Sequence, residues 1–392
     1  LSANFKTFFD NNRKIEFYYQ SESYLKSYYF PYYNSSPYEN ENGETFLWSS
    51  PKKSEFSIIY ISDLNNHSIS FGLDNIYESY KSINIYGANN LLEVSSIFGD
   101  NDTKDINQNS IFILDDFTLK NLKINLGFRL NHSSKYKTNF SPSISIKKVI
   151  RNYNYRFNFS HSYRNPSIKE LYYSFEDHPG GFPVIGNENL NPSTSDYLSL
   201  SIESRKLINN SIEFYYNHVY NMIANKFEYL ESFDEIVYIY DNYKEINLFG
   251  VNFNLSFNPS DKTTLKSAYS YTGFNSEHKD VLDGISKHSI NFRFKYDLMD
   301  NLHLTLSTNY ASSKTVDSSL DDVDNNRTEV ILPSHSISNL TIVKSFQKNI
   351  YIKMGIKNMF NYIDVNEEAP DFLASYEPGR RYFISINLNF EK

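Results

Sequence analysis

Residues 122–131, with the sequence LKINLGFRLN, decide the fold of this chain. Apolar side chains occupy every second position, and polar or small residues lie between them; the apolar set is Leu122, Ile124, Leu126, Phe128 and Leu130. Successive side chains of a β-strand point to opposite faces, so the pattern predicts a strand with one apolar face and one polar face. The same alternation occurs in residues 350–357 and 382–390.

The spacing between such strands predicts how they are connected. Short links, such as those at residues 65–66, 120–121 and 300–301, alternate with longer polar links near residues 31–54, 82–109, 132–139, 165–192, 275–284, 315–333 and 361–378. This alternation is typical of outer-membrane barrels, which have short turns on one rim and long loops on the other. We therefore predict an all-β, transmembrane antiparallel β-barrel with about 17 strands of spanning length.

The composition agrees with this fold class and excludes several others. The 392 residues carry a formal net charge of −8, include 34 Tyr and 31 Phe, and contain no Cys. The absence of Cys excludes disulfides and thiolate metal sites, and the acidic balance argues against a nucleic-acid partner. Interfacial belts of a barrel would account for the aromatic residues, although biased codon usage is an alternative source. Only the barrel explains the alternation.

Four segments carry a resemblance to a known family. They are YRNP at 163–166, KELYY at 169–173, GNENLNPSTSDY at 186–197 and the terminal sequence PGRRYFISINLNF. Together they resemble the C-terminal part of a TonB-dependent outer-membrane receptor. The resemblance implies that residues 1–392 form the C-terminal portion of a barrel of about 22 strands. We expect the remaining strands, a plug and a TonB-binding segment to precede this chain.

Within that family the chain is most similar to haem receptors. Their two signature boxes correspond here to residues 163–166, bounded by Tyr163 and Pro166, and residues 187–190, bounded by Asn187 and Leu190. His178 is the only His between them. The resemblance implies that residues 164–193 form a ligand-binding extracellular loop and that His178 ligates haem iron. Asn165 replaces the usual Ala at the third position of the first box, and Glu188 replaces the usual Pro at the second position of the second box.

Each candidate residue of this loop also has a structural interpretation. His178 can ligate iron as a neutral imidazole or simply be solvated. Arg164 can pair with a haem propionate, or it can hold the rim of the strand by pairing with Glu170 or Asp177. The aromatic candidates can form the apolar wall of a porphyrin site or an interface belt; they are Tyr172, Tyr173, Phe175 and Phe182.

The sequence thus predicts TonB-dependent uptake of haem, either free or from a haem-carrier protein, by a receptor in the lipid of the cell outer membrane. Haem would be the transported ligand, and no intrinsic cofactor is expected. We find no catalytic motif, so the chain is not expected to be an enzyme. A siderophore or cobalamin receptor is the alternative within the family. A passive porin is the alternative outside it, and a plug encoded upstream would discriminate between them.

Overall fold

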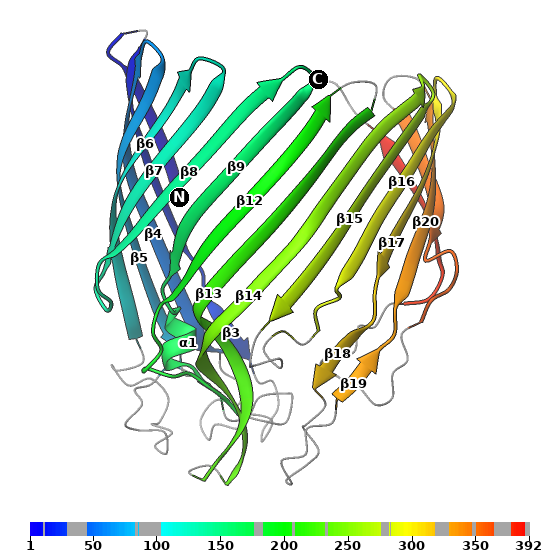
Figure 1. The fold of residues 1–392 in the computed structure, drawn as a ribbon. Coiled ribbons are helices and arrows are strands. Elements are labelled where there is room, and N and C mark those ends of the chain that lie inside the picture. Colours follow the sequence, from blue (N-terminus) through cyan, green and yellow to red (C-terminus); the bar gives the residue numbers. More distant parts are fainter. Residues whose placement is uncertain are drawn as a thin grey trace. The chain divides into compact units, whose positions relative to one another are not determined.

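The computed structural model describes residues 1–10, 12–29, 45–82, 85, 103–175, 183–205, 208–231, 234–275, 282, 284–317, 329–346, 350–363 and 378–388. Strands dominate these residues (Figure 1). Seventeen of the strands have seven or more residues, in agreement with the number expected: β1 (Ser2–Phe8), β2 (Arg13–Ser23), β4 (Thr45–Leu64), β5 (His67–Ser82), β6 (Thr103–Leu119), β7 (Leu122–Ser133), β8 (Asn139–Ile150), β9 (Tyr153–Arg164), β12 (Ser193–Arg205), β13 (Ile208–Leu230), β14 (Glu235–Ser260), β15 (Thr263–Asn275), β16 (His288–Met299), β17 (Leu302–Ala311), β20 (His335–Phe346), β21 (Ile350–Lys357) and β22 (Arg381–Leu388).

Short elements occupy the longer links between these strands. They are β3 (Lys26–Tyr29), β10 (Ser174–Phe175), β11 (Val184–Ile185), β18 (Lys314–Asp317), β19 (Glu329–Leu332) and the helix α1 (Ile168–Tyr172). Within the described ranges, no helix is long and apolar enough to cross a membrane. The chain divides into two compact units. The first comprises Leu1–Ile146, Phe159–Asp196 and Val219–Glu245, and the second comprises Lys147–Asn158, Tyr197–His218 and Ile246–Lys392.

In the first unit, neighbouring strands are antiparallel and in register from β1 through β2, β4, β5 and β6 to β7. One row of directly opposed residues is apolar and consists of Ile58, Leu73, Ile111 and Leu130. The last three side chains of this row are 41–50% exposed. The adjacent row, which faces the other way, is polar and includes the buried pair Ser110 and Asn131. Apolar residues outside and polar residues inside form the pattern of a barrel surrounded by lipid.

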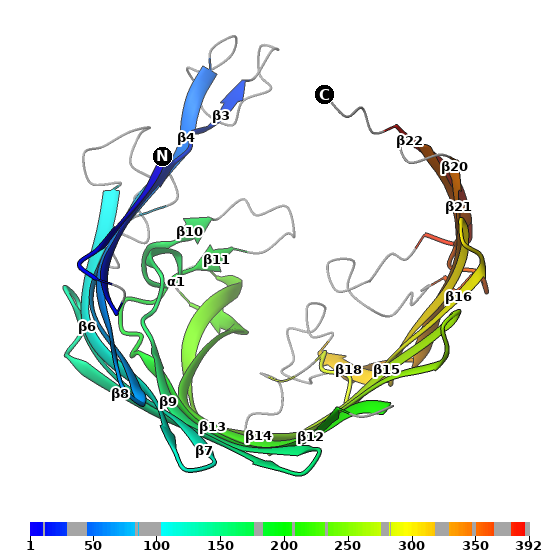
Figure 2. The ribbon, with the colours of Figure 1, turned by 90° about the horizontal axis from the view of Figure 1, so that it is seen from above.

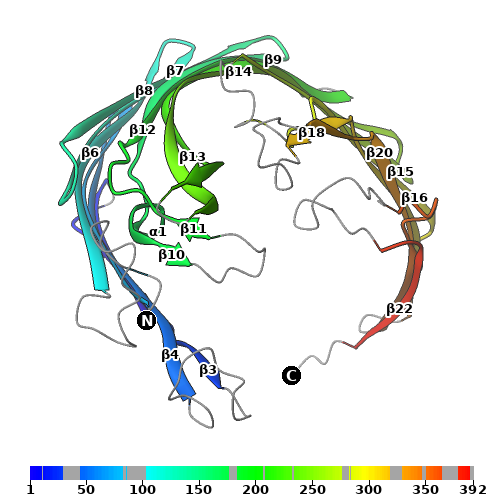
Figure 3. The ribbon, with the colours of Figure 1, turned by 90° about the horizontal axis from the view of Figure 1, so that it is seen from below.

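The second unit repeats the same arrangement from β14 to β22. Figure 3 shows β15, β16, β20 and β22 as parts of its curved sheet. An apolar row crosses seven antiparallel strands of this unit through directly opposed residues: Phe257, Leu265, Phe294, Leu306, Leu340, Ile356 and Tyr382. The different environments of the two faces therefore fix the pairing register of these strands. A slip of one residue would move the apolar side chains of a strand to the polar face.

Tight turns form one class of link, as expected from the sequence. Asn65, Lys120 and Arg151 begin links of this class and have φ values of 53°, 56° and 54°. Left-handed backbone of this kind matches the twist of a two-residue hairpin. Longer links alternate with these turns along the chain, for example at residues 83–102, 165–192 and 358–380.

Two of the expected long links are shorter than the sequence indicated. Residues 45–54 were assigned to a link but belong to β4, and residues 103–109 belong to β6 rather than to a link. Neither segment alternates: Phe46, Leu47 and Trp48 are consecutive and residues 49–54 lack apolar side chains other than Pro51, while residues 103–109 are mostly polar. A spanning strand needs only about 9–11 residues, whereas β4 has 20 and β14 has 26. Outside the hydrocarbon a strand can continue without an apolar face.

The two faces of β12 provide a test of this arrangement. Leu200 is 55% exposed on the apolar face of the strand, and Ser201 lies next to it on the polar face. We expect Leu200→Lys to destabilise the membrane-inserted protein by about 2–4 kcal/mol, since a cation would be placed in hydrocarbon. The matched variant Ser201→Lys should have little effect. Denaturant unfolding in lipid vesicles measures both, and equal losses would contradict the assignment of the faces.

Candidate functional site

The link between β9 and β12 folds back on the first unit and begins with a capped helix. In Figure 2, α1, β10 and β11 lie on the concave side of the sheet that includes β4, β6 and β8. Ser167 is the N-cap of α1. Its hydroxyl accepts a hydrogen bond from the Glu170 backbone N–H at 3.2 Å, and the Glu170 carboxylate accepts one from the Ser167 backbone N–H at 2.7 Å. This reciprocal capping box fixes the start of the helix. We call residues 165–192 the docked link.

Glu170 also ties the helix to the end of β9. Arg164 donates to both carboxylate oxygens of Glu170, at 2.9 and 3.1 Å, and the Glu170 side chain is only 15% exposed. Burial acts to raise the pKa of Glu170, but the hydrogen bonds from Arg164 and Ser167 outweigh it, so the pKa lies below its ordinary value. Arg164 therefore lies in an ion pair at the rim, with one of the two partners that the sequence suggested.

A small apolar core holds the docked link in place. It consists of buried residues from the link, from β6 and β13 and from residue 85: Ile85, Ile106, Ile168, Leu171, Leu190 and Ile223. Pro166, the last residue of the first box, is also fully buried. Burial of a side chain such as Leu171 contributes about 1.5–3 kcal/mol. The described part of the link is therefore packed rather than free.

The second box binds directly to the helix that follows the first. The Gly186 N–H donates to the Tyr173 carbonyl at 2.5 Å, and the Asn187 N–H donates to the Glu170 carbonyl at 2.8 Å. The Asn187 side chain donates to the Tyr240 carbonyl at 3.1 Å and accepts from the Asn189 N–H at 3.0 Å. These bonds satisfy backbone groups at the helix end. Asn187 of the second box therefore has a structural role, because it attaches the link to α1 and to β14.

Gly186 is required by close packing. A Cβ atom at this position would lie 2.7 Å from backbone atoms of Leu171, Tyr172 and Tyr173. Backbone atoms cannot move aside as the end of a flexible side chain can. The attachment of residues 186 and 187 to the end of α1 therefore depends on Gly186 having no side chain.

Main-chain pairing extends the docked link onto β14. Strand β10 pairs antiparallel with β11, and β11 pairs parallel with β14 through Val184 opposite Tyr238 and Ile185 opposite Ile239. Val184 and Ile185 are buried. The link thus adds two short strands to the part of β14 that lies in the first unit.

Three lysines gather around the tyrosines of the docked link. The ammonium groups of Lys104 and Lys135 lie 4.7 and 4.5 Å from the Tyr172 ring centroid, and Lys135 also donates to the Tyr172 hydroxyl at 2.7 Å. The ammonium of Lys169 lies 5.3 Å from the ring of Tyr80 and 5.6 Å from that of Tyr173. We call this group the lysine–tyrosine cluster: Lys104, Lys135, Lys169, Tyr80, Tyr172 and Tyr173.

The lysines of this cluster are largely unmatched by acids. Lys135 has a distant partner in Glu188 at 3.8 Å. Within the part of the chain that the structure describes, Lys104 and Lys169 make cation–π contacts but no ion pair. An excess of ammonium groups beside aromatic rings attracts an anionic ligand.

The sequence prediction placed Tyr172 and Tyr173 in the site, and both lie in this cluster. The Tyr163 hydroxyl donates to Asn165, and Leu190 is 2% exposed in the small core. His178 and Phe182 lie outside the described residues, so their roles stay predictions. Sequence reasoning missed Lys104 and Lys135, because nothing in the sequence brings these positions to a helix more than 30 residues away.

Comparison with known proteins gives the same picture for the chain as a whole. A family model described as "TonB dependent receptor-like, beta-barrel" matches residues 1–359. The iron-regulated outer membrane virulence protein of Vibrio cholerae serotype O1 is 22% identical over 358 residues, covering 86% of this chain. The chain spans about half, 51%, of the length of that protein.

Solved structures share the fold at low sequence identity. A variant of the ferric enterobactin receptor PfeA of Pseudomonas aeruginosa has a TM-score of 0.77 and 15% identity, and the match covers 97% of this chain and 60% of that one. The siderophore receptor PirA of Acinetobacter baumannii has a TM-score of 0.75 and 15% identity, with the same coverage of 97% and 60%. At this level of identity the likeness describes the fold alone.

The contact between the two boxes can be tested at Gly186. We expect Gly186→Ala to push α1 out of place, because overpacking against backbone typically costs about 1–3 kcal/mol. The amides of Leu171 and Tyr173, which bond to Ser167 and Lys169, should then exchange hydrogen faster. Amides of β16 and β17 provide the internal reference and should not change. Unaltered exchange at Leu171 and Tyr173 would show that the boxes do not need this close contact.

Proposed function

The chain belongs to the TonB-dependent receptor family of β-barrels, and on that premise we propose that the whole protein imports an anionic iron complex with energy supplied through TonB. Membership places it in the cell outer membrane, among transporters rather than enzymes. The barrel would lie in outer-membrane lipid, and its polar face would line the path. TonB would act on a segment that precedes the barrel.

The observation that carries the ligand class is the lysine–tyrosine cluster. Ferric catecholate siderophores and haem both present anionic oxygen atoms, phenolate or carboxylate, beside an aromatic surface. Lys104 and Lys169 offer unneutralised positive charge, while Tyr80 and Tyr173 offer aromatic surface beside it. Such a site attracts the complex by charge and orients it by stacking. The proteins that this chain resembles, an iron-regulated outer membrane protein and two siderophore receptors, fit this ligand class.

The cluster predicts a loss of affinity when its free lysines are neutralised. In the full-length receptor, we expect Lys104→Gln combined with Lys169→Gln to weaken binding of the transported iron complex roughly tenfold or more, since two charge-assisted contacts are lost. Ferric catecholate, ferric hydroxamate and haem are compared by binding titration and by uptake of labelled iron. Uptake of the preferred complex should also cease in cells that lack TonB.

Lys81→Gln is the matched control for this pair. Lys81 follows Tyr80 in β5, so its side chain points to the opposite face of the strand. Lys81→Gln removes one positive charge close to the cluster without touching it, and is compared with each single lysine variant as well as with the pair. If the double variant binds and imports every complex as the unaltered receptor does, the cluster is not the ligand site.

Haem remains a specific candidate because His178 lies between the two boxes in the sequence, and Asn187 of the second box is bonded to Glu170 of the helix that follows the first box. In that case His178 would ligate the iron, and Arg164, Tyr172 and Tyr173 would lie beside the porphyrin. A haem-carrier protein could then deliver the ligand. A siderophore would not need His178 as an iron ligand, because it already coordinates its iron.

A single substitution separates the two ligands. If haem is the cargo, His178→Ala in the full-length receptor should weaken haem binding and change the Soret band, because an axial ligand is lost. Assembly should be unaffected, since substitutions at exposed loop positions usually cost under about 0.5 kcal/mol. His132→Ala is the control, because His132 lies near the end of β7, outside the docked link, and its ring contacts Thr138 at 3.1 Å. An unchanged spectrum and affinity would exclude His178 as the ligand and favour the siderophore.

A further inference from the structure

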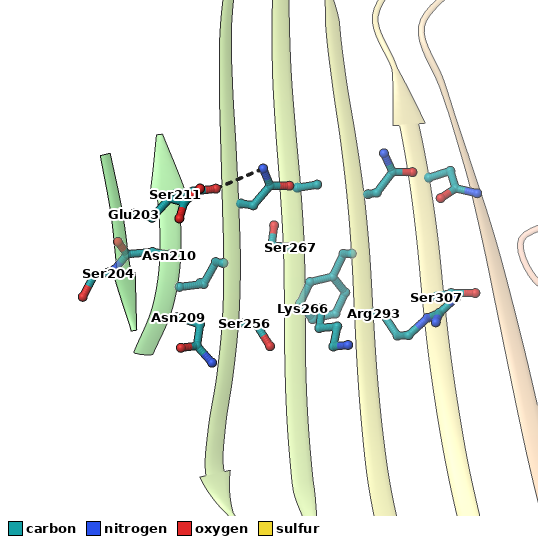
Figure 4. A pocket seen from close by; sticks show the side chains of 16 residues that line it. Glu203, Ser204, Asn209, Asn210, Ser211, Ser256, Lys266, Ser267, Arg293 and Ser307 are labelled. Carbon is teal, nitrogen blue, oxygen red and sulfur yellow. Dashed lines mark hydrogen bonds between the residues drawn. The ribbon is translucent and has the colours of Figure 1, made fainter. Parts of the chain in front are cut away.

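Charged side chains are expected on the polar face of the sheet. On that face of the second unit, Glu203, Lys266 and Arg293 line a concavity of about 720 Å³ (Figure 4). Asp115 of β6, in the first unit, lies instead on the apolar face. It follows the exposed Ile111 by four residues, and side chains an even number of residues apart in a strand share a face. Asp115 is therefore an acid on the face that meets lipid.

The neighbours of Asp115 on this face are apolar. Ile69 of β5 and Leu126 of β7 lie directly opposite it, and Ile113 and Phe117 are the next residues of β6 on the same face. The Asp115 side chain is only 26% exposed. A lone carboxylate among such neighbours would be costly, so it requires a hydrogen-bond donor or a cation beside it.

His67 supplies one such donor. Its Nδ1 lies 2.9 and 3.1 Å from the two carboxylate oxygens of Asp115, and its ring stacks on Phe117 with the ring centroids 4.8 Å apart. These contacts together hold the imidazole in one orientation. Because Nδ1 is engaged, Nε2 is the nitrogen that can bind a further partner. Among the residues that the structure describes, none hydrogen-bonds this Nε2.

The pair of His67 and Asp115 lies at the rim that the tight turns form. His67 is the first residue of β5 and is paired with Leu64 of β4 across the turn at residues 65–66. In outer-membrane barrels the short turns are periplasmic. At this rim the apolar belt of a barrel ends and the lipid headgroups begin. The headgroup of a phospholipid in the periplasmic leaflet can therefore reach both side chains.

The charges of the pair indicate which headgroup fits. With the imidazole protonated, His67 and Asp115 place one positive and one negative charge side by side, with no net charge. Arg13 lies in the same row of opposed residues, but its guanidinium already pairs with Asp10 at 2.6 Å. The pair thus complements a headgroup that carries one cation and one anion. A carboxylate also favours an ammonium that has N–H donors.

We propose that His67 and Asp115 bind the phosphoethanolamine headgroup of a phospholipid in the periplasmic leaflet. The ammonium of the headgroup donates to the Asp115 carboxylate, and Nε2–H of His67 donates to the phosphate. The acyl chains lie over the apolar rows toward the middle of the sheet, which include Ile113 and the opposed Phe128. The site is on the lipid-facing side and does not depend on which iron complex the receptor takes.

Lipid titration of the full-length receptor tests this proposal. The receptor is purified in detergent, its assembly is checked by heat-modifiable mobility on a gel, and bound lipid is counted by native mass spectrometry. Three phospholipids with the same acyl chains are compared. Phosphatidylethanolamine should bind roughly fivefold more tightly than phosphatidylcholine, whose ammonium has no N–H donor, as expected for one charge-assisted contact. It should also bind more tightly than phosphatidylglycerol, which has no cation.

Asp115→Asn should abolish the preference for phosphatidylethanolamine over phosphatidylcholine, because the carboxylate that accepts from the ammonium is lost. Asp116→Asn is the matched control. Asp116 follows Asp115 in β6, so its side chain points to the polar face, where it accepts from Asn125 at 2.7 Å. This variant should keep the full preference. Equal binding of the two zwitterionic lipids by the unaltered receptor would overturn the proposal. So would tighter binding of phosphatidylglycerol, or an equal effect of the two substitutions.

Discussion

The structure depends on one constraint: hydrocarbon offers no partner for a backbone N–H or C=O group. Each spanning strand must therefore bond to neighbours on both sides, and the in-register ladders from β1 to β7 and from β14 to β22 show how this is done. With the backbone satisfied, side chains need only match the medium on each face. Apolar side chains therefore form rows on the face toward lipid, and polar side chains form rows on the opposite face.

The docked link obeys a different rule, because it lies where polar and apolar contacts are both available. Its helix is only five residues long, below the length at which an isolated helix is stable. Three attachments compensate: the capping box at Ser167, the small core around Leu171, and the bonds from Gly186 and Asn187 to the helix end. Asn187 of the second box thus attaches to the helix that follows the first box, and this helix carries Lys169 and Tyr172 of the lysine–tyrosine cluster.

Local patterns explain why some of this could be predicted from sequence and some could not. The alternation at residues 122–131 and the tight turns at Asn65 and Lys120 are local signals, so strand number and link order followed from them. The extension of β4 over residues 45–54 was missed because its apolar residues, Phe46, Leu47 and Trp48, are consecutive and do not alternate with polar ones. Parallel pairing of β11 with β14, and the approach of Lys104 to Tyr172, join residues more than 50 positions apart. No single sequence without an alignment carries that information.

The pairing of β11 with β14 has a consequence for how the receptor can change over evolutionary time. Main-chain hydrogen bonds read the backbone and not the identity of side chains. The docked link is therefore anchored by contacts that most substitutions leave intact, apart from positions such as Gly186 where packing admits only one residue. Residues of the link that face away from its core can diverge while the segment keeps its place. Residues that contact the ligand can therefore change while the fold of the link is kept.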